Sequence, residues 1–287
     1  MRDLSRSGCR GLLCLLALVA SPAAAMAGET LDDDFYGIAY QAGKGYDFST
    51  MAVNAFVWQQ GGDIWDESKA PEAQAEGVVN SDVAVAAFDE FLSYLQYMPP
   101  VAQTGQMDIF VIQDLYMQGK VGAIIDWVGL GEPVLDPSAS KVHDKSAFGP
   151  APGTRKADGS IDRTGNIGGQ PFVLTTWNSD EVVDEALNVV KWWLNSDTQL
   201  EAVKNGGQSG LMSVMADPSY NDLRPWNRAH VEMIDWQKDV WHIPDFFELL
   251  TQQQEEFDKA ITGQISAKEA LDAVAEFQQE LLEDGGY

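Results

Sequence analysis

A short apolar run at residues 121–125 constrains the fold more than any other stretch of the sequence. Five apolar or small residues are too few for a helix, but they suit a buried strand. The run ends at Asp126 and Trp127, and a turn of small residues follows. A carboxylate beside an indole suits a hydroxylated ligand, because the ring offers an apolar face and the carboxylate accepts hydrogen bonds. A core tryptophan beside a surface aspartate explains the same spacing equally well.

Helix-like and strand-like segments alternate along the rest of the chain. Helical patterns cover residues 50–60, 83–97, 108–118, 180–195, 197–204, 244–262 and 266–283. Short runs at residues 35–40, 63–67, 147–149 and 170–176 are predicted as strands. The start of the last helix is well marked, since Ser266 and Glu269 form a capping-box pattern. This alternation predicts the α/β fold class.

The first 27 residues have the three-part pattern of a secretory signal: a basic start, an apolar run and a small-residue end. The apolar run is too short to span a membrane, and we expect cleavage after Ala27. Both cysteines, Cys9 and Cys14, lie in this segment, so the mature chain would have no disulfide and no thiol chemistry. Export without disulfides is typical of a bacterial periplasm, which is the predicted location.

The chain is strongly acidic, with 18 basic and 44 acidic residues and a formal net charge of −26. Such a charge argues against nucleic acid and against anionic lipid as partners. It does not by itself indicate a cationic ligand, because most acidic side chains coat the solvated surface.

Motifs for cofactor and metal chemistry are absent from the sequence. There is no phosphate-binding loop, no dinucleotide fingerprint and no nucleophile elbow. The three histidines, His143, His230 and His242, lack the spacing of metal ligands. We therefore expect no cofactor and no metal.

One acidic cluster leaves an enzyme as an alternative. Asp63, Asp66 and Glu67 flank Trp65. A secreted carbohydrate-active hydrolase would use Asp63 or Glu67 with a second, distant carboxylate. In so acidic a chain, a solvated turn is the simpler explanation of this cluster.

Aromatic residues are the other candidates for ligand contact. The chain has nine tryptophans, and core burial explains most of them. Trp192 and Trp193 are neighbours on a predicted helix, where at least one is expected in the core. Tyr46, Trp58 and Trp127 lie near predicted element ends, where loops build binding sites.

Several short motifs, in this order, resemble extracellular solute-binding proteins of bacterial ABC importers, in the maltose-binding-like class that binds sugars or polyols. The motifs are residues 56–62, Asn80-Ser81-Asp82, the Gly119-Lys120 strand ending at Asp126-Trp127, residues 148–153, Gly168-Gly169, the helix end at residues 191–194, Ser213-Val214 before Asp217-Pro218, Ile243-Pro244 and residues 262–266. The resemblance covers nearly all of residues 35–287.

The resemblance implies a type II periplasmic-binding-protein fold, in which two α/β lobes joined by a hinge close over a ligand. It assigns residues 28–166 and 219–287 to the second lobe. Residues 167–218 would form the hinge return and the residual part of the first lobe. It places Tyr46, Asp126 and Trp127 in the cleft. Gly168 and Gly169 would lie at the hinge, and Gln208 in a loop of the other lobe that can touch ligand.

The chain also departs from the family pattern. Many sugar or polyol relatives have an arginine near Met212 and a tryptophan near Gln170, and this chain has neither. Family members also have most of their first lobe before the position of Tyr36, whereas here the signal runs almost directly into it. We therefore expect one nearly complete lobe, and a loosely held segment, residues 170–204, that exposes apolar surface. A non-binding remnant would show such a patch around Val173 and Leu187 and would have no cleft.

The resulting hypothesis is a periplasmic substrate-binding component of an ABC transporter. Its partners would be a small hydroxylated solute and a membrane permease. We expect a monomer that is not an enzyme and does not bind nucleic acid. The hydrolase is one alternative, and a non-binding remnant of a longer protein is another.

Overall fold

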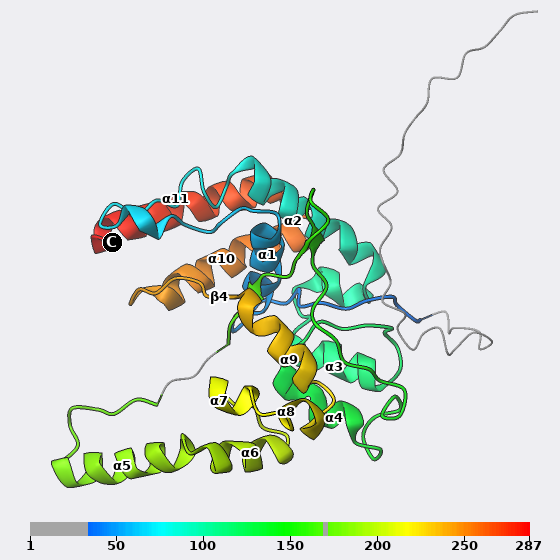
Figure 1. The fold of residues 1–287 in the computed structure, drawn as a ribbon. Coiled ribbons are helices and arrows are strands. Elements are labelled where there is room, and N and C mark those ends of the chain that lie inside the picture. The colour runs from blue at the N-terminus through cyan, green and yellow to red at the C-terminus, as the bar shows by residue number, and fades with distance from the viewer. Residues whose placement is uncertain (1–33, 169–171) are drawn as a thin grey trace, which may run out of the picture. The chain divides into compact units, whose positions relative to one another are not determined.

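Four helices carry the main core of the protein. In the computed structural model, which describes residues 34–168 and 172–287, α10 (Phe246–Ile261) and α11 (Ala267–Gly285) pack side by side (Figure 1). Helix α10 also contacts α1 (Phe48–Gln59), and α11 contacts α2 (Asp82–Tyr94). The predicted signal, residues 1–27, lies outside the described residues.

Aromatic and aliphatic side chains fill the space between these helices. Phe88 of α2 and Phe257 of α10 are fully buried, with ring centroids 4.8 Å apart. Phe91 and Leu271 are also fully buried. Because α2 and α10 are distant in sequence, this contact ties the two ends of the chain into one core.

The predicted helices are confirmed within a few residues at each end. Besides the four core helices, α3 spans Ile109–Met117, α5 spans Asp180–Trp193 and α6 spans Ser196–Lys204. The predicted capping box is present, with Ser266 and Glu269 each bonding the other's backbone N–H. Four shorter α-helices also occur among the described residues: α4 (Gly131–Leu135), α7 (Met212–Met215), α8 (Tyr220–Leu223) and α9 (Asn227–Met233).

The predicted strands are mostly wrong. The runs at residues 35–40 and 121–125 form only two parallel bridges, Tyr36 with Val121 and Ala39 with Ile124. The run at 63–67 contributes one bridge and a 3₁₀ turn, and residues 147–149 and 172–176 form no strand. A parallel strand is stabilised by neighbours on both edges, and the described residues supply only one.

Regular strands occur only as two short pairs among the described residues. β1 (Thr154–Arg155) and β2 (Ile161–Asp162) are antiparallel. β3 (Gly165–Asn166) and β4 (Gln237–Lys238) are parallel. The second pair joins the segment before Gly168 to the segment after α9.

A second, smaller cluster lies around Tyr220. Val203 of α6 and Val214 of α7 pack with Tyr220 of α8, and Val231 and Ile234 border them. This cluster draws on residues from both sides of the boundary predicted between residues 218 and 219. The described residues, 34–168 and 172–287, belong to one unit by their contacts. The lobe boundaries therefore stay a prediction.

Helix α5 contributes nothing to either core. Its apolar residues, among them Val183, Leu187 and Val190, have no core to enter among the described residues: no residue of α5 is buried, and Leu187 and the following Leu194 are exposed. The expectation that Trp192 or Trp193 lies in the core is wrong, since Trp192 is 61% exposed and Trp193 is half-buried.

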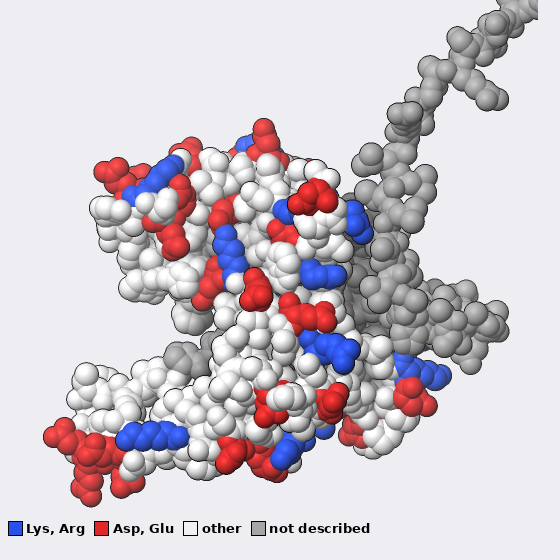
Figure 2. Space-filling model, in the orientation of Figure 1, with Lys and Arg blue, Asp and Glu red and all other residues white. Residues whose placement is uncertain are grey.

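The expectation of exposed apolar surface around α5 is confirmed. Trp177, just before the helix, is 92% exposed and Val173 is 77% exposed. Figure 2 shows carboxylates gathered at the N-terminal end of α5 and uncharged atoms over much of the rest of this segment. The amphipathic pattern of α5 therefore has no partner among the described residues.

Candidate ligand-binding site

Two segments that run parallel to each other end at the candidate site. The backbone N–H of Ala39 donates to the carbonyl of Ala123 over 2.9 Å, and the N–H of Ile125 donates to the carbonyl of Ala39 over 3.3 Å. The loop at residues 41–47 follows the first segment, and Asp126 and Trp127 follow the second. Loops at the carboxyl ends of parallel strands are frequent ligand sites in α/β proteins.

An exposed aromatic pair lies at this end. The ring centroids of Tyr46 and Trp127 are 6.0 Å apart, with the planes inclined at 65°. Tyr46 is 60% exposed and Trp127 is 42% exposed. Large aromatic side chains that stay exposed and in contact with each other offer an apolar surface to a ligand.

The backbone that carries Tyr46 is held by Gln254 of α10. Gly45 and Tyr46 both have positive φ, 118° and 46°, a conformation that is costly for tyrosine. The amide of Gln254 accepts from Gly45 N over 2.9 Å and donates to Tyr46 O over 2.6 Å. Gln254 is 3% exposed. One buried amide thus satisfies both polar groups of the strained turn.

The turn after Trp127 is held by two other contacts. The amide of Gln113 on α3 donates to Leu130 O over 2.6 Å. Gly131 lies against the indole of Trp226, so that a Cβ at this position would come within 2.6 Å of the ring. The approach requires glycine and fixes where the turn enters α4.

Gln208 reaches the same turn. Its Nε2 lies 3.0 Å from the place of a Cβ on Gly129, two residues after Trp127. The structure therefore brings the rings of Tyr46 and Trp127 into contact, with Asp126 next to Trp127 in the chain and Gln208 at the turn that follows.

The other candidates are not brought to this place. Trp58 is 4% exposed, its Nε1 donates to Asp63 over 3.2 Å, and Lys238 lies 5.5 Å from its ring centroid. The indole of Trp58 thus serves the core. Gly168 is exposed after β3, with open space around its Cα. Gly169 lies outside the described residues.

Two carboxyl groups flank the ring pair in the chain. Asp126 Oδ1 accepts from Trp127 N over 2.7 Å, whereas Oδ2 is buried and has no partner among the described residues. Burial raises the pKa of Asp126 to about 7, and the bond from Trp127 N lowers it in part. Burial also raises the pKa of Asp47 to about 6, and its Oδ1 is buried without a partner among the described residues.

The raised pKa of Asp126 predicts a pH-dependent stability. A carboxyl whose pKa rises on folding stabilises the fold at low pH, and this contribution is lost as pH rises from its ordinary value of 3.8 to about 7. As pH rises from 5 to 8, the free energy of unfolding of the parent protein should therefore fall by about 1–2 kcal/mol more than that of the Asp126→Asn variant. Denaturant unfolding at several pH values measures the difference.

Asp136→Asn is the control for this pH series. Hydrogen bonds from Ser138 lower the pKa of Asp136, so this group is ionised throughout the range. Its removal should leave the slope between pH 5 and pH 8 unchanged. Equal slopes for the parent protein and Asp126→Asn would contradict a buried, proton-binding Asp126.

In the acidic cluster that suggested a hydrolase, Asp63 already accepts hydrogen bonds from neighbouring groups. Asp63 accepts from Trp58 Nε1, from Ile64 N and from Lys238 Nζ, the last over 2.6 Å. Glu67 is exposed in a 3₁₀ turn. A catalytic pair would need a second carboxylate near Asp63, and the contacts of Asp63 among the described residues include none.

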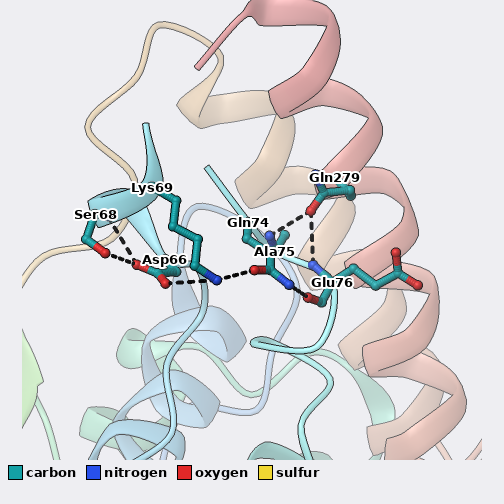
Figure 3. A network of polar contacts seen from close by, with 7 residues as sticks. All are labelled: Asp66, Ser68, Lys69, Gln74, Ala75, Glu76 and Gln279. Carbon is teal, nitrogen blue, oxygen red and sulfur yellow. Dashed lines mark hydrogen bonds and ion pairs between the residues drawn. The ribbon is translucent and has the colours of Figure 1, made fainter. Parts of the chain in front are cut away.

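An open hollow of about 460 Å³ lies elsewhere, between the loop at residues 66–77 and α11. Hydrogen bonds hold the loop to α11 here (Figure 3): Gln279 Oε1 accepts from Ala75 N and Glu76 N. Within the loop, Lys69 donates to Gln74. Its lining residues, mostly Glu, Gln and Lys, bond one another and offer no aromatic surface. It is not the candidate site.

The described part of the chain contains neither a candidate metal-binding cluster nor a candidate membrane-spanning helix. No three His, Cys, Asp or Glu residues among residues 34–168 and 172–287 lie close enough to hold a metal ion. Within the same residues, no helix combines the length and the apolar character needed to cross a bilayer.

Solved structures identify the fold. No protein-family model and no curated protein matches the chain. Maltose-bound MalE3 of T. maritima superimposes with a TM-score of 0.73 at 19% identity, over 86% of this chain. An ABC transporter solute-binding protein from Agrobacterium radiobacter K84, in complex with ribitol, gives 0.71 at 18% identity over 88%. A cyclo/maltodextrin-binding protein complexed with maltotetraose gives 0.66 at 16% identity over 90%.

The superposition covers most of this chain but only part of each solved chain. The chain spans 61% of the first two solved chains and 62% of the third. At these identities the likeness concerns the fold. The chain has the type II periplasmic-binding-protein fold that ABC transporter solute-binding proteins for sugars and polyols share.

Proposed function

We propose that this protein is a solute-binding component of an ABC importer and that Tyr46 and Trp127 contact a small hydroxylated solute. The observation that carries the proposal is the exposed ring pair at the end of two parallel segments. Both rings stand on backbone held by buried amides, Gln254 for Tyr46 and Gln113 for the turn after Trp127. Positioned aromatic side chains beside hydrogen-bonding groups suit a sugar or polyol.

The solved neighbours support the solute class. The neighbours were solved with maltose, ribitol, D-mannitol or α-D-tagatose bound. Because the chain spans about three fifths of their length, we propose that residues 34–287 supply one wall of the site. Gln208 and the hinge glycines Gly168 and Gly169 stay in this proposal as further candidates for contact with the solute.

The remaining parts of the proposal concern location and partners. The protein would act in the periplasm after cleavage behind Ala27, and would deliver its solute to a membrane permease as a monomer. The neighbours are transport proteins that bind their ligands, and we propose no catalytic step for this chain.

Trp127→Ala is expected to weaken solute binding at least tenfold, about 1.4 kcal/mol, because the variant removes the larger of the two ring surfaces. Calorimetric titration of the parent protein with maltose, ribitol, D-mannitol and D-tagatose first identifies a solute that binds. The affinity of Trp127→Ala for that solute is then measured.

Trp192→Ala is the matched control, since Trp192 is also exposed but lies on α5. It should leave the affinity unchanged. Equal losses in both variants would mean that Trp127 is not a ligand contact. Absence of binding by the parent protein to the whole panel would favour the non-binding alternative.

A further inference from the structure

We propose that the Tyr46–Trp127 site selects hydroxylated solutes that carry a protonated amino group, such as an amino sugar or an amino alcohol. The inference rests on the proposed function, because it concerns the same site and names its substrate class more narrowly. Three features of the site, as the described residues show it, lead to it: hydrogen-bond acceptors without donors, carboxylates without cations, and exposed ring faces.

The acceptors come from one end of the bridged segments. Ala39 pairs with Ile124 in the parallel bridge. Gln41 and Asp126 each lie two residues further along, so the same register places them opposite each other. Gln41 is 3% exposed, and its Oε1 has no hydrogen-bond partner among the described residues. A buried amide oxygen without a partner is costly, so an unmet acceptor at this place calls for a donor.

The carboxylates add two more unmet acceptors, Asp47 Oδ1 and Asp126 Oδ2. Each belongs to a residue next to one of the two rings in the chain. Within the described residues neither carboxylate forms an ion pair, and Lys44 of the same loop is exposed and pairs with neither. A charge buried without a counter-charge is unfavourable, and a bound cation removes this penalty.

An ammonium group fits these needs better than a hydroxyl group. It has three donors and no acceptor, whereas a hydroxyl has one donor and also needs a donor for its own oxygen. It also brings the positive charge that the two carboxylates lack. The argument concerns these buried groups and does not depend on the negative charge spread over the surface.

The rings offer a second contribution to cation binding. A cation over the face of tyrosine or tryptophan is attracted by about 0.5–1 kcal/mol at exposed sites. Tyr46 and Trp127 are inclined at 65° to each other and both are partly exposed. Their faces therefore offer a ligand both an apolar surface and cation–π attraction.

Matched pairs of probes test the amino preference by calorimetry at pH 7.5 and roughly 0.15 M salt, where exposed charges are well screened. The pairs are D-glucosamine with D-glucose and 1-amino-1-deoxy-D-sorbitol with D-sorbitol. N-acetyl-D-glucosamine serves as a neutral analogue of similar shape. We expect the amino member of at least one pair to bind at least tenfold more tightly than its neutral partner.

Two site variants and one surface variant test whether the preference for amino solutes depends on Asp47 and Asp126. Asp47→Asn and Asp126→Asn should each reduce the amino-to-neutral affinity ratio at least threefold. Asp144→Asn, which removes an exposed carboxylate that is adjacent in the chain to neither ring, should leave that ratio unchanged.

The outcomes separate this inference from the proposed function. Equal affinity for amino and neutral members would overturn the inference and leave the proposed function standing. An amino preference that survives both site variants, or that falls equally in Asp144→Asn, would place the cation elsewhere and also overturn it. If no member of either pair binds, the inference is overturned, and the proposed function is decided by the panel of maltose, ribitol, D-mannitol and D-tagatose.

Discussion

Phe257→Ala should lower the free energy of unfolding by about 3–5 kcal/mol, the range for removing a fully buried phenylalanine from a packed core. Phe257 is 0% exposed and lies 4.8 Å from Phe88, also 0% exposed, measured between ring centroids. Both neighbours come from well-formed helices, so the core cannot close over the space that the ring leaves. Denaturant unfolding followed by circular dichroism measures the loss.

Phe247→Ala is the control for this cavity. Phe247 belongs to the same helix α10 but is 70% exposed. Its removal should change stability by less than about 0.5 kcal/mol, as surface substitutions generally do. Similar losses in the two variants would show that α10 does not bury Phe257 against α2.

Gln254→Leu should cost about 2–3 kcal/mol of stability and should also weaken the binding of any solute that Trp127 contacts. The substitution leaves Gly45 N–H and Tyr46 C=O without their partner, and each buried polar group left unsatisfied costs about 1–3 kcal/mol. Without the amide, the positive φ of Tyr46 has little to hold it, so the ring would leave its place beside Trp127. Unfolding and calorimetric titration give the two readouts.

Gln252→Leu is the matched control, two residues earlier on α10. The amide of Gln252 makes one long contact, 3.4 Å to Ala273 O, away from the turn. It should cost less than about 1 kcal/mol and leave solute affinity unchanged. A stable Gln254→Leu protein with unaltered affinity would show that the turn keeps its conformation without the amide.

The sequence predicts the helices well because their signals are local. Ser81, Asp108, Ser179 and Ser266 cap the helices that follow them, each through a bond to backbone only two or three residues ahead. The strands are predicted poorly because a strand depends on partners far away in the chain. The apolar runs at residues 35–40 and 121–125 find each other, but no longer ladder forms among the described residues.

The candidate site is predicted in part for the same reason. Tyr46, Asp126 and Trp127 stand out in the sequence because each lies at the end of an element. Gln254 does not, because its contact with the Gly45–Tyr46 turn spans more than 200 residues. Gln41 and Asp47 are also missed, since their significance is the absence of a partner, and only the structure reports that.

The isolation of α5 has a consequence for hydrogen exchange. A helix of 14 residues with no buried side chain is stabilised mainly by its own terminal signals: the Ser179 cap, Asp180 and Glu181 in the first turn, and Lys191 in the last. Isolated helices of this length are marginal in water. The backbone amides of α5 would therefore exchange with solvent through local opening, while those of α2 and α10 exchange only when the core unfolds.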